Sequence, residues 1–239
     1  MLSPDTILSL TNTFQTTETN IKREYFQHVF LSYFYQQPEA EHIFFKGGTA
    51  LRILYNSPRF SEDLDFNSAF IDTKGIETLV VDTLLQMEKE NIRCTLEEGN
   101  PTTGGFFAII TFHGFAQPVR IQLEISQREE EKTGEVVAIT SEFVPAYNVI
   151  AVTERQLVLE KMRALLQRKK PRDFYDLYFI LRKDLPIPDK THVLRQALQA
   201  LQTADINFEA ELKQFLPKTH WLIIRNFRES LQRELERFL

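Results

Sequence analysis

Residues 44–66 read FFKGGTALRILYNSPRFSEDLDF, and they contain the strongest structural signal in the chain. A short apolar run over residues 43–45 leads into a glycine pair, and an apolar-rich segment over residues 50–55 follows. This order predicts a strand, a tight turn and a helix. Residues 62–66 are predicted to form a second strand, in which Leu64 and Phe66 point into the core.

The second predicted strand carries two carboxylates, Asp63 and Asp65. Side chains two residues apart on a strand share a face, so the two carboxylates are expected to lie side by side. They repel, and each raises the pKa of the other, unless a cation neutralises them. Hard oxygen ligands at this spacing suit Mg²⁺ better than zinc. An isolated Asp-x-Asp pair is more often a solvated strand edge or a helix cap.

The glycine pair upstream favours the metal interpretation. Gly47, Gly48 and Thr49 lie between a predicted strand and a predicted helix, where backbone N–H groups and the helix dipole attract an anion. A turn that holds phosphate beside carboxylates that hold metal is what transfer from a nucleoside triphosphate requires. Glu124 in VRIQLEI (residues 119–125) is the candidate third carboxylate, although its alternation equally fits a side chain that simply faces solvent.

A second block, EKMRALLQRKKPRDFYDLYFIL over residues 160–181, predicts two helices, the second starting at Pro171. Lys161 is a candidate contact for the triphosphate, because an ammonium is a mobile point charge that neutralises phosphate. Asp173 and Asp176, three residues apart, are candidates for orienting that lysine or the acceptor. The alternative is a solvated basic turn between two packed helices, with weak surface ion pairs.

Together the two blocks resemble the AbiEii-type toxin nucleotidyltransferases, a family of the polymerase-β-like nucleotidyltransferase superfamily. FKGGTALR with RFSEDLDF resembles the family's first motif, and LVLEKMRALLQRKKPRDFYDL resembles its later motifs. The match covers residues 44–66 and 157–181 closely. The family's first motif often has Gly-Ser where this chain has Gly-Gly-Thr, and Thr49 supplies the hydroxyl.

The resemblance implies roles for individual residues. Gly47, Gly48 and Thr49 would hold the triphosphate, and Asp63 and Asp65 would bind Mg²⁺ or Mn²⁺.

In the rest of the chain, the resemblance implies that Glu124 is the third metal-binding carboxylate. Lys161 would contact nucleotide phosphate, and Asp173 and Asp176 would complete the active site from the helical half. The implied catalytic residues are Asp63, Asp65, Glu124, Lys161 and Asp176.

The implied fold is α/β (α+β), a polymerase-β-like core with a small mixed sheet and a C-terminal helical domain. We expect the core over residues 1–150 and the helical domain, which would close the active-site cleft, over 151–239. The implied reaction moves a nucleoside monophosphate from a nucleoside triphosphate to an acceptor hydroxyl. Family members are toxins of bacterial toxin–antitoxin or phage-defence operons, so tRNA and a cognate antitoxin are the implied partners.

Composition narrows the function further. The net charge of −5 argues against a protein that coats nucleic acid, but Arg168, Lys169, Lys170 and Arg172 form a local basic block that favours a nucleic-acid acceptor. A small-molecule nucleotidyltransferase of the antibiotic-modifying type and a catalytically silent nucleotide- or RNA-binding module are the alternatives. The single cysteine, Cys94, excludes an intrachain disulfide. Without a signal-peptide pattern or a long apolar run, we expect a cytoplasmic protein with no membrane contact.

Overall fold

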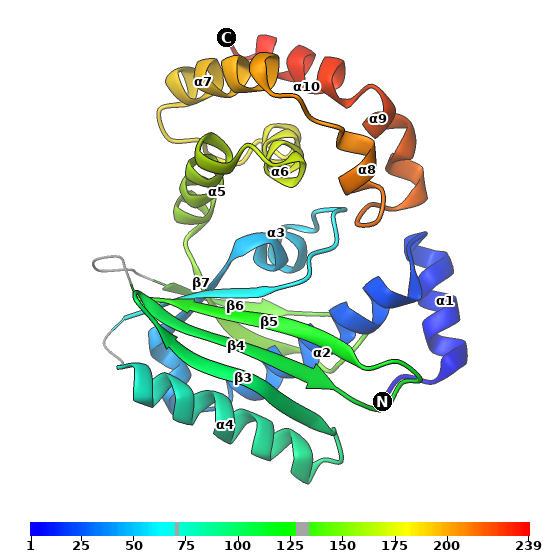
Figure 1. Cartoon of the computed structure of the whole chain (residues 1–239), viewed down its shortest axis with the longest axis vertical. Helices are drawn as coiled ribbons and strands as arrows, with labels where there is room; N and C mark the ends of the chain where they lie inside the picture. Colours follow the sequence, from blue (N-terminus) through cyan, green and yellow to red (C-terminus); the bar gives the residue numbers. More distant parts are fainter. Residues whose placement is uncertain (70–71, 128–133) are drawn as a thin grey trace. The chain divides into compact units, whose positions relative to one another are not determined.

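The computed structural model describes residues 1–69, 72–127 and 134–239 (Figure 1). The chain divides into two compact units. The first comprises residues 1–13, 17–56 and 60–152, and the second comprises residues 14–16, 57–59 and 153–239.

The first unit is built on a mixed sheet of seven strands in the order β3-β4-β5-β2-β1-β7-β6. Its strands are β1 (Ile43–Lys46), β2 (Leu64–Ser68), β3 (Cys94–Thr102), β4 (Gly105–Phe112), β5 (Val119–Ser126), β6 (Gly134–Ile139) and β7 (Tyr147–Val152). Strand β2 pairs antiparallel with β1 and parallel with β5, so it lies in the middle of the sheet. The prediction of a mixed α/β fold with C-terminal helices is confirmed.

The helices of this unit are α1 (Pro4–Phe14), α2 (Glu18–Phe34), the 3-10 helix η1 (Pro38–His42), α3 (Gly47–Tyr55) and α4 (Thr73–Lys89). Thr17 begins α2 by accepting a hydrogen bond from the Asn20 N–H group at 3.2 Å. Helices α2 and α4 pack on each other, and α4 also contacts β3 and β4. The apolar core between them is aromatic, and the ring of Phe26 stacks on Phe112 with centroids 4.7 Å apart.

Two sequence expectations for this unit need correction. The second strand was expected over residues 62–66, but β2 begins at Leu64, so Asp63 precedes it. The cause is that β1 ends at Lys46, where α3 begins, and Lys46 pairs with Asp65; no residue of β1 remains to pair with Asp63. Strands β6 and β7 were not expected at all.

The second unit is helical over its whole C-terminal part. Its helices are α5 (Glu154–Arg168), α6 (Pro171–Arg182), α7 (Lys190–Thr203), α8 (Phe208–Leu212), the 3-10 helix η2 (Lys218–His220), α9 (Trp221–Arg225) and α10 (Phe227–Glu236). Pro171 begins α6, as the sequence predicts, and Thr153 is the N-cap residue of α5. The C-terminal stretch forms two helices, α9 and α10, because the chain breaks at Asn226. Among the described residues, no helix is long and apolar enough to cross a membrane.

Candidate functional site

Gly47 opens α3 with a φ of +84°, a conformation that residues with a side chain rarely adopt. A Cβ atom built on Gly47 would overlap the Asp65 carboxylate, so the Asp65 side chain lies directly against the Gly47 backbone. The glycine turn and the second predicted carboxylate, eighteen residues apart in the sequence, therefore meet in the structure. Any side chain at position 47 would have to displace Asp65.

The first turn of α3 has no side-chain cap from its N-cap residue, Lys46. An ammonium carries only donors, so it cannot accept from the N–H groups of that turn. Thr49 is fully buried, and its hydroxyl donates to the backbone carbonyl of Asp63. Thr49 therefore fixes the chain just before β2, and an anion at this helix end would meet backbone N–H groups rather than the Thr49 hydroxyl.

A row of polar residues crosses the sheet at Asp65. Asp65 is the register partner of Lys46 on β1 and of Glu124 on β5. Side chains directly opposite each other on neighbouring strands share a face, so these three lie on one side of the sheet. Glu124 is exposed, whereas Asp63 and Asp65 are half-buried. The structure therefore places Glu124 beside Asp65, on the strand next to it.

The fit of these carboxylates to a metal ion can be tested on their chemistry. Among the described residues, no three His, Cys, Asp or Glu side chains converge closely enough to hold a metal ion. Mg²⁺, however, is usually held by only one or two carboxylates together with waters and phosphate oxygens. Asp63 and Asp65 meet that requirement, and Glu124 stands on the adjacent strand. The oxygen donor set fits Mg²⁺ or Mn²⁺ and does not fit zinc.

The second unit contains a buried cluster around Asp176. Arg59 donates to both carboxylate oxygens of Asp176, from Nε at 2.8 Å and from Nη2 at 3.0 Å. Lys161 donates from Nζ to Oδ2 at 2.8 Å. We call Arg59, Lys161 and Asp176 the charge triad. The Asp176 side chain is 1% exposed, so the carboxylate is enclosed by its two cations and positions them.

The charges of the triad set the ionisation of Asp176. Burial by itself raises the pKa of the Asp176 carboxyl, but the neighbouring charges of Arg59 and Lys161 outweigh burial and lower that pKa to about 2. Asp176 is therefore ionised throughout the physiological range. Because an ammonium has three N–H donors and one of them goes to Asp176, Lys161 keeps donors for a second acceptor.

Asp173 has a different environment from the one its spacing suggested. Its carboxylate accepts from the Lys170 N–H group at 3.2 Å and from Arg168 Nη2 at 2.6 Å. It lies at the third position of α6 and caps the start of that helix. The Asp173 side chain is only 1% exposed, so in this structure its contacts are those of a helix cap.

The basic block divides into paired and unpaired side chains. Arg168 pairs with Asp173, and Arg172 lies 3.6 Å from Glu211 of α8. Lys169 and Lys170 are exposed, and within the described part of the chain neither forms an ion pair. The charge open to a ligand is thus concentrated on these two lysines.

Residues 29–239 match the family model described as nucleotidyl transferase AbiEii toxin, type IV TA system. The chain belongs to the AbiEii nucleotidyltransferase toxin family.

Two solved structures share the fold of this AbiEii protein. One is the crystal structure of JHP933 from Helicobacter pylori, with a TM-score of 0.57 and 18% identity, covering 93% of this chain and 95% of the other. The second is a crystal structure titled as a putative nucleotidyltransferase from H. pylori, with a TM-score of 0.58 and 19% identity, covering 93% and 99%. No curated protein matches the chain significantly.

Two arginines of the AbiEii motifs have roles that sequence reasoning missed. Arg52 makes a bidentate pair with Glu24 of α2, at 2.9 and 3.1 Å, and lies over the Phe60 ring at 3.9 Å. Its role is to tie α3 to α2. Arg59 stands in RFSEDLDF just before the carboxylates, yet it belongs to the second unit and pairs with Asp176. The sequence shows Arg59 within the motif, but it does not indicate that the partner of Arg59 is Asp176.

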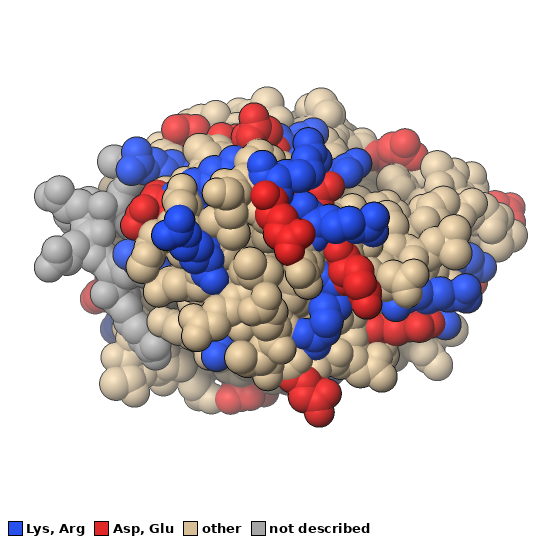
Figure 2. Space-filling view, turned by 90° about the horizontal axis from the view of Figure 1, so that it is seen from above, with Lys and Arg blue, Asp and Glu red and all other residues tan. Residues whose placement is uncertain are grey.

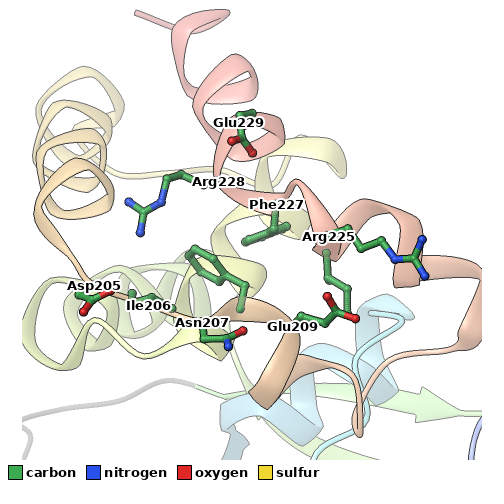
Figure 3. A pocket seen from close by; sticks show the side chains of 10 residues that line it. Asp205, Ile206, Asn207, Glu209, Arg225, Phe227, Arg228 and Glu229 are labelled. Carbon is green, nitrogen blue, oxygen red and sulfur yellow. The ribbon is translucent and has the colours of Figure 1, made fainter.

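One pocket of the AbiEii protein lies elsewhere in the second unit. It has a volume of about 370 Å³, and residues 205–207 line it together with α8, α9 and α10. In Figure 3 the Arg225 and Arg228 side chains point in opposite directions. Arg228 donates to the backbone carbonyls of Leu201 and Ala204, where α7 ends. Its guanidinium therefore caps the C-terminus of α7. None of the expected site residues lines this pocket.

Proposed function

We propose that this AbiEii protein transfers a nucleoside monophosphate from a nucleoside triphosphate to an acceptor hydroxyl, with Mg²⁺ or Mn²⁺ as cofactor. One observation carries the proposal: the glycine that opens α3 lies against the carboxylate of Asp65. That contact joins an anion-binding helix end to a carboxylate pair. This is the combination that transfer from a metal-bound triphosphate needs.

The residues of each unit have distinct tasks in this proposal. The N–H groups at the start of α3 bind the triphosphate, and the helix dipole favours its negative charge. Asp63 and Asp65, with Glu124 beside them, would hold the metal ion, which when bound neutralises phosphate and favours the ionised acceptor hydroxyl. Gly47 keeps the helix end and Asp65 in contact. Lys161 of the second unit would contact nucleotide phosphate, and Asp176 holds its ammonium in place.

For the acceptor we propose an RNA, tRNA being the candidate. Lys169 and Lys170 are exposed cations without ion-pair partners in the described structure. Lys169 also lines a hollow of about 330 Å³ between α5 and α7, whose other polar lining residues include Gln196 and Gln199. Cations beside amide groups suit a phosphate backbone and a base edge.

The face shown in Figure 2 and the net charge of the chain both favour a local RNA contact. On the face in Figure 2, Lys and Arg side chains are interleaved with Asp and Glu, and they form no continuous basic surface there. The net charge of −5 agrees with this pattern. Because the family is the toxin of a type IV toxin–antitoxin system, we also propose that a cognate antitoxin accompanies this protein.

The test is a transfer assay in which the fate of the label is followed. The protein is incubated with Mg²⁺, total tRNA and each nucleoside triphosphate in turn, labelled at the α-phosphate. We expect label on tRNA from at least one triphosphate and none when EDTA replaces Mg²⁺. Label on a small molecule would contradict the RNA acceptor but keep the transferase. Absence of label from every acceptor would contradict the proposed reaction.

A further inference from the structure

The backbone just before β2 is held by side chains from two helices of the first unit. Gln27 of α2 donates from Nε2 to the Ser61 carbonyl at 3.1 Å, and the Thr49 hydroxyl of α3 donates to the Asp63 carbonyl. Both donors are enclosed, since Gln27 is 1% exposed and Thr49 is 0% exposed. A buried donor that loses its acceptor is costly, so each bond fixes the carbonyl that it meets.

Two further contacts reach the same segment. The Arg52 guanidinium, which pairs with Glu24 of α2, lies 3.9 Å from the centre of the buried Phe60 ring. Arg23 lies 3.3 Å from the Glu62 carboxylate, and this pair is weak because 17% and 40% of the two side chains are exposed. Each residue over 60–63 is thus contacted from α2 or α3, and the two buried hydrogen bonds are the most directional of these contacts.

Asp63 relies on these contacts because it lies outside the sheet. Strand β2 begins at Leu64, whose register partner on β5 is Leu123. Asp65, by contrast, is in register with Lys46 of β1 and belongs to the ladder. The ladder therefore places the backbone of Asp65 directly, whereas the backbone of Asp63 is placed by bonds from the two helices.

We infer that Gln27 and Thr49 are positioning residues for Asp63: they hold its backbone so that both aspartates face one metal ion. The inference rests on the proposed function, because it assigns that ion to Asp63 and Asp65. In this role neither Gln27 nor Thr49 needs to touch the metal ion or the triphosphate. Removing a partner that orients a metal ligand typically lowers metal affinity roughly 10- to 100-fold.

The experiment measures the binding of Mn²⁺ alone, by electron paramagnetic resonance, to protein that has been stripped with EDTA and dialysed. No nucleotide is present, so a direct contact between Thr49 and phosphate would not affect the result. Gln27→Met and Thr49→Val nearly keep the size of each side chain but remove its donor. We expect both to bind Mn²⁺ roughly 10-fold or more weakly than the wild type. Thr49→Ser keeps the hydroxyl and should bind within about 3-fold of the wild type.

The matched control is Thr83→Val. Thr83 is also fully buried, but its hydroxyl donates at 2.7 Å to the Leu79 carbonyl of its own helix, α4. We expect this variant to lose stability in denaturant unfolding and to keep its Mn²⁺ affinity. Glu62→Gln, which breaks only the partly exposed pair with Arg23, should keep that affinity as well.

Three results would overturn the inference. The first is Mn²⁺ binding by Gln27→Met and Thr49→Val that is as tight as that of Thr83→Val. The second is binding by Thr49→Ser that is as weak as that of Thr49→Val. The third is wild-type Mn²⁺ binding that Asp65→Asn leaves unchanged. If one of the two donor-removing variants does not fold, the other decides alone. If neither folds, Gln27→Asn, which withdraws the donor by one methylene, decides by the same comparison.

Failure of this inference is distinguishable from failure of the proposed function, because the binding assay involves no turnover. If Gln27→Met and Thr49→Val bind Mn²⁺ normally while Asp65→Asn has lost transfer activity, the inference is wrong and the proposed function stands. If Asp65→Asn retains transfer activity, the proposed function is wrong whatever the Mn²⁺ affinities are.

Discussion

At the scale of single residues, Gly47 is the position where conformation and chemistry depend on each other most closely. Gly47→Ala would place a methyl group on the Asp65 carboxylate and force alanine to a φ of +84°. We expect a loss of about 1–3 kcal/mol in the free energy of unfolding. Displacement of Asp65 by about 1 Å should lower transfer roughly 100-fold. Denaturant unfolding and the transfer assay measure the two effects.

Gly99→Ala is the control for this substitution. A Cβ atom there meets the end of the flexible Leu96 side chain at 3.2 Å and the Phe106 ring at 3.5 Å, which is an ordinary van der Waals distance, so neither stability nor transfer should fall as far. If Gly47→Ala is as active and as stable as Gly99→Ala, the contact between Gly47 and Asp65 contributes neither to transfer nor to stability.

Lys169 gives a second prediction for a single residue. It ends α5 in the left-handed conformation, with a φ of 53°, where glycine is the usual residue. Lys169→Gly and Lys169→Ala remove the same charge, but only glycine relieves the backbone. We expect the glycine variant to be more stable than the alanine variant by about 1 kcal/mol, with equal transfer to tRNA. Equal thermal stability of the two variants would show that this conformation is not strained.

At the scale of elements, local patterns predicted the strands and helices that lie closest to the site. The apolar run before Gly47 predicted β1, and alternation over residues 119–125 predicted β5, because each signal is contained in a few neighbouring residues. The side-chain partners were not predictable in the same way. Asp173 and Asp176 have nearly equivalent places on α6, yet one caps the helix and the other binds Arg59 from a distant segment. Sequence spacing carries no information on that distant partner.

The packing of α2 on β7 makes stability depend on pH. Burial, reinforced by the charge of Arg52, lowers the pKa of His28 to about 4, and its Nδ1 lies 2.8 Å from the Tyr147 hydroxyl. Since the folded pKa is below the ordinary value of 6.5, protonation favours the unfolded chain. This stabilisation is complete above pH 6.5 and is lost as the pH falls through 4. Its size is about 3 kcal/mol.

Unfolding by denaturant between pH 7 and 4 measures this contribution. We expect His28→Gln to reduce the pH dependence over that range, relative to the wild type. His42→Gln, at a half-buried histidine with 42% of its side chain accessible, should leave the dependence unchanged. Identical pH profiles for His28→Gln and the wild type would contradict the account of this buried histidine.

At the scale of the whole molecule, a chain with a net charge of −5 must bind RNA through few contacts. We expect Lys169→Glu with Lys170→Glu to abolish transfer to tRNA and largely to keep triphosphate binding. Each lost phosphate contact should reduce the slope of log affinity against log salt by roughly 0.7 to 0.9. Arg163→Glu is the control, since Arg163 is an exposed cation of α5 outside the basic block. Normal labelling of tRNA by the double variant would show that the basic block is only a solvated connection between α5 and α6.

The most direct test of the central claim is the rate of nucleotide transfer by Asp65→Asn, measured beside Asp63→Asn and beside Glu62→Gln as the matched control. Glu62 is the neighbouring carboxylate and pairs at 3.3 Å with Arg23. We predict that both aspartate variants lose roughly 100-fold or more in rate, because metal-ion stabilisation is worth several kcal/mol. Their thermal stability should hold or rise, since one of two repelling carboxylates is gone. Glu62→Gln should remain active. Near-normal transfer by both aspartate variants would contradict the claim that this protein is a metal-dependent nucleotidyltransferase whose metal is held by Asp63 and Asp65.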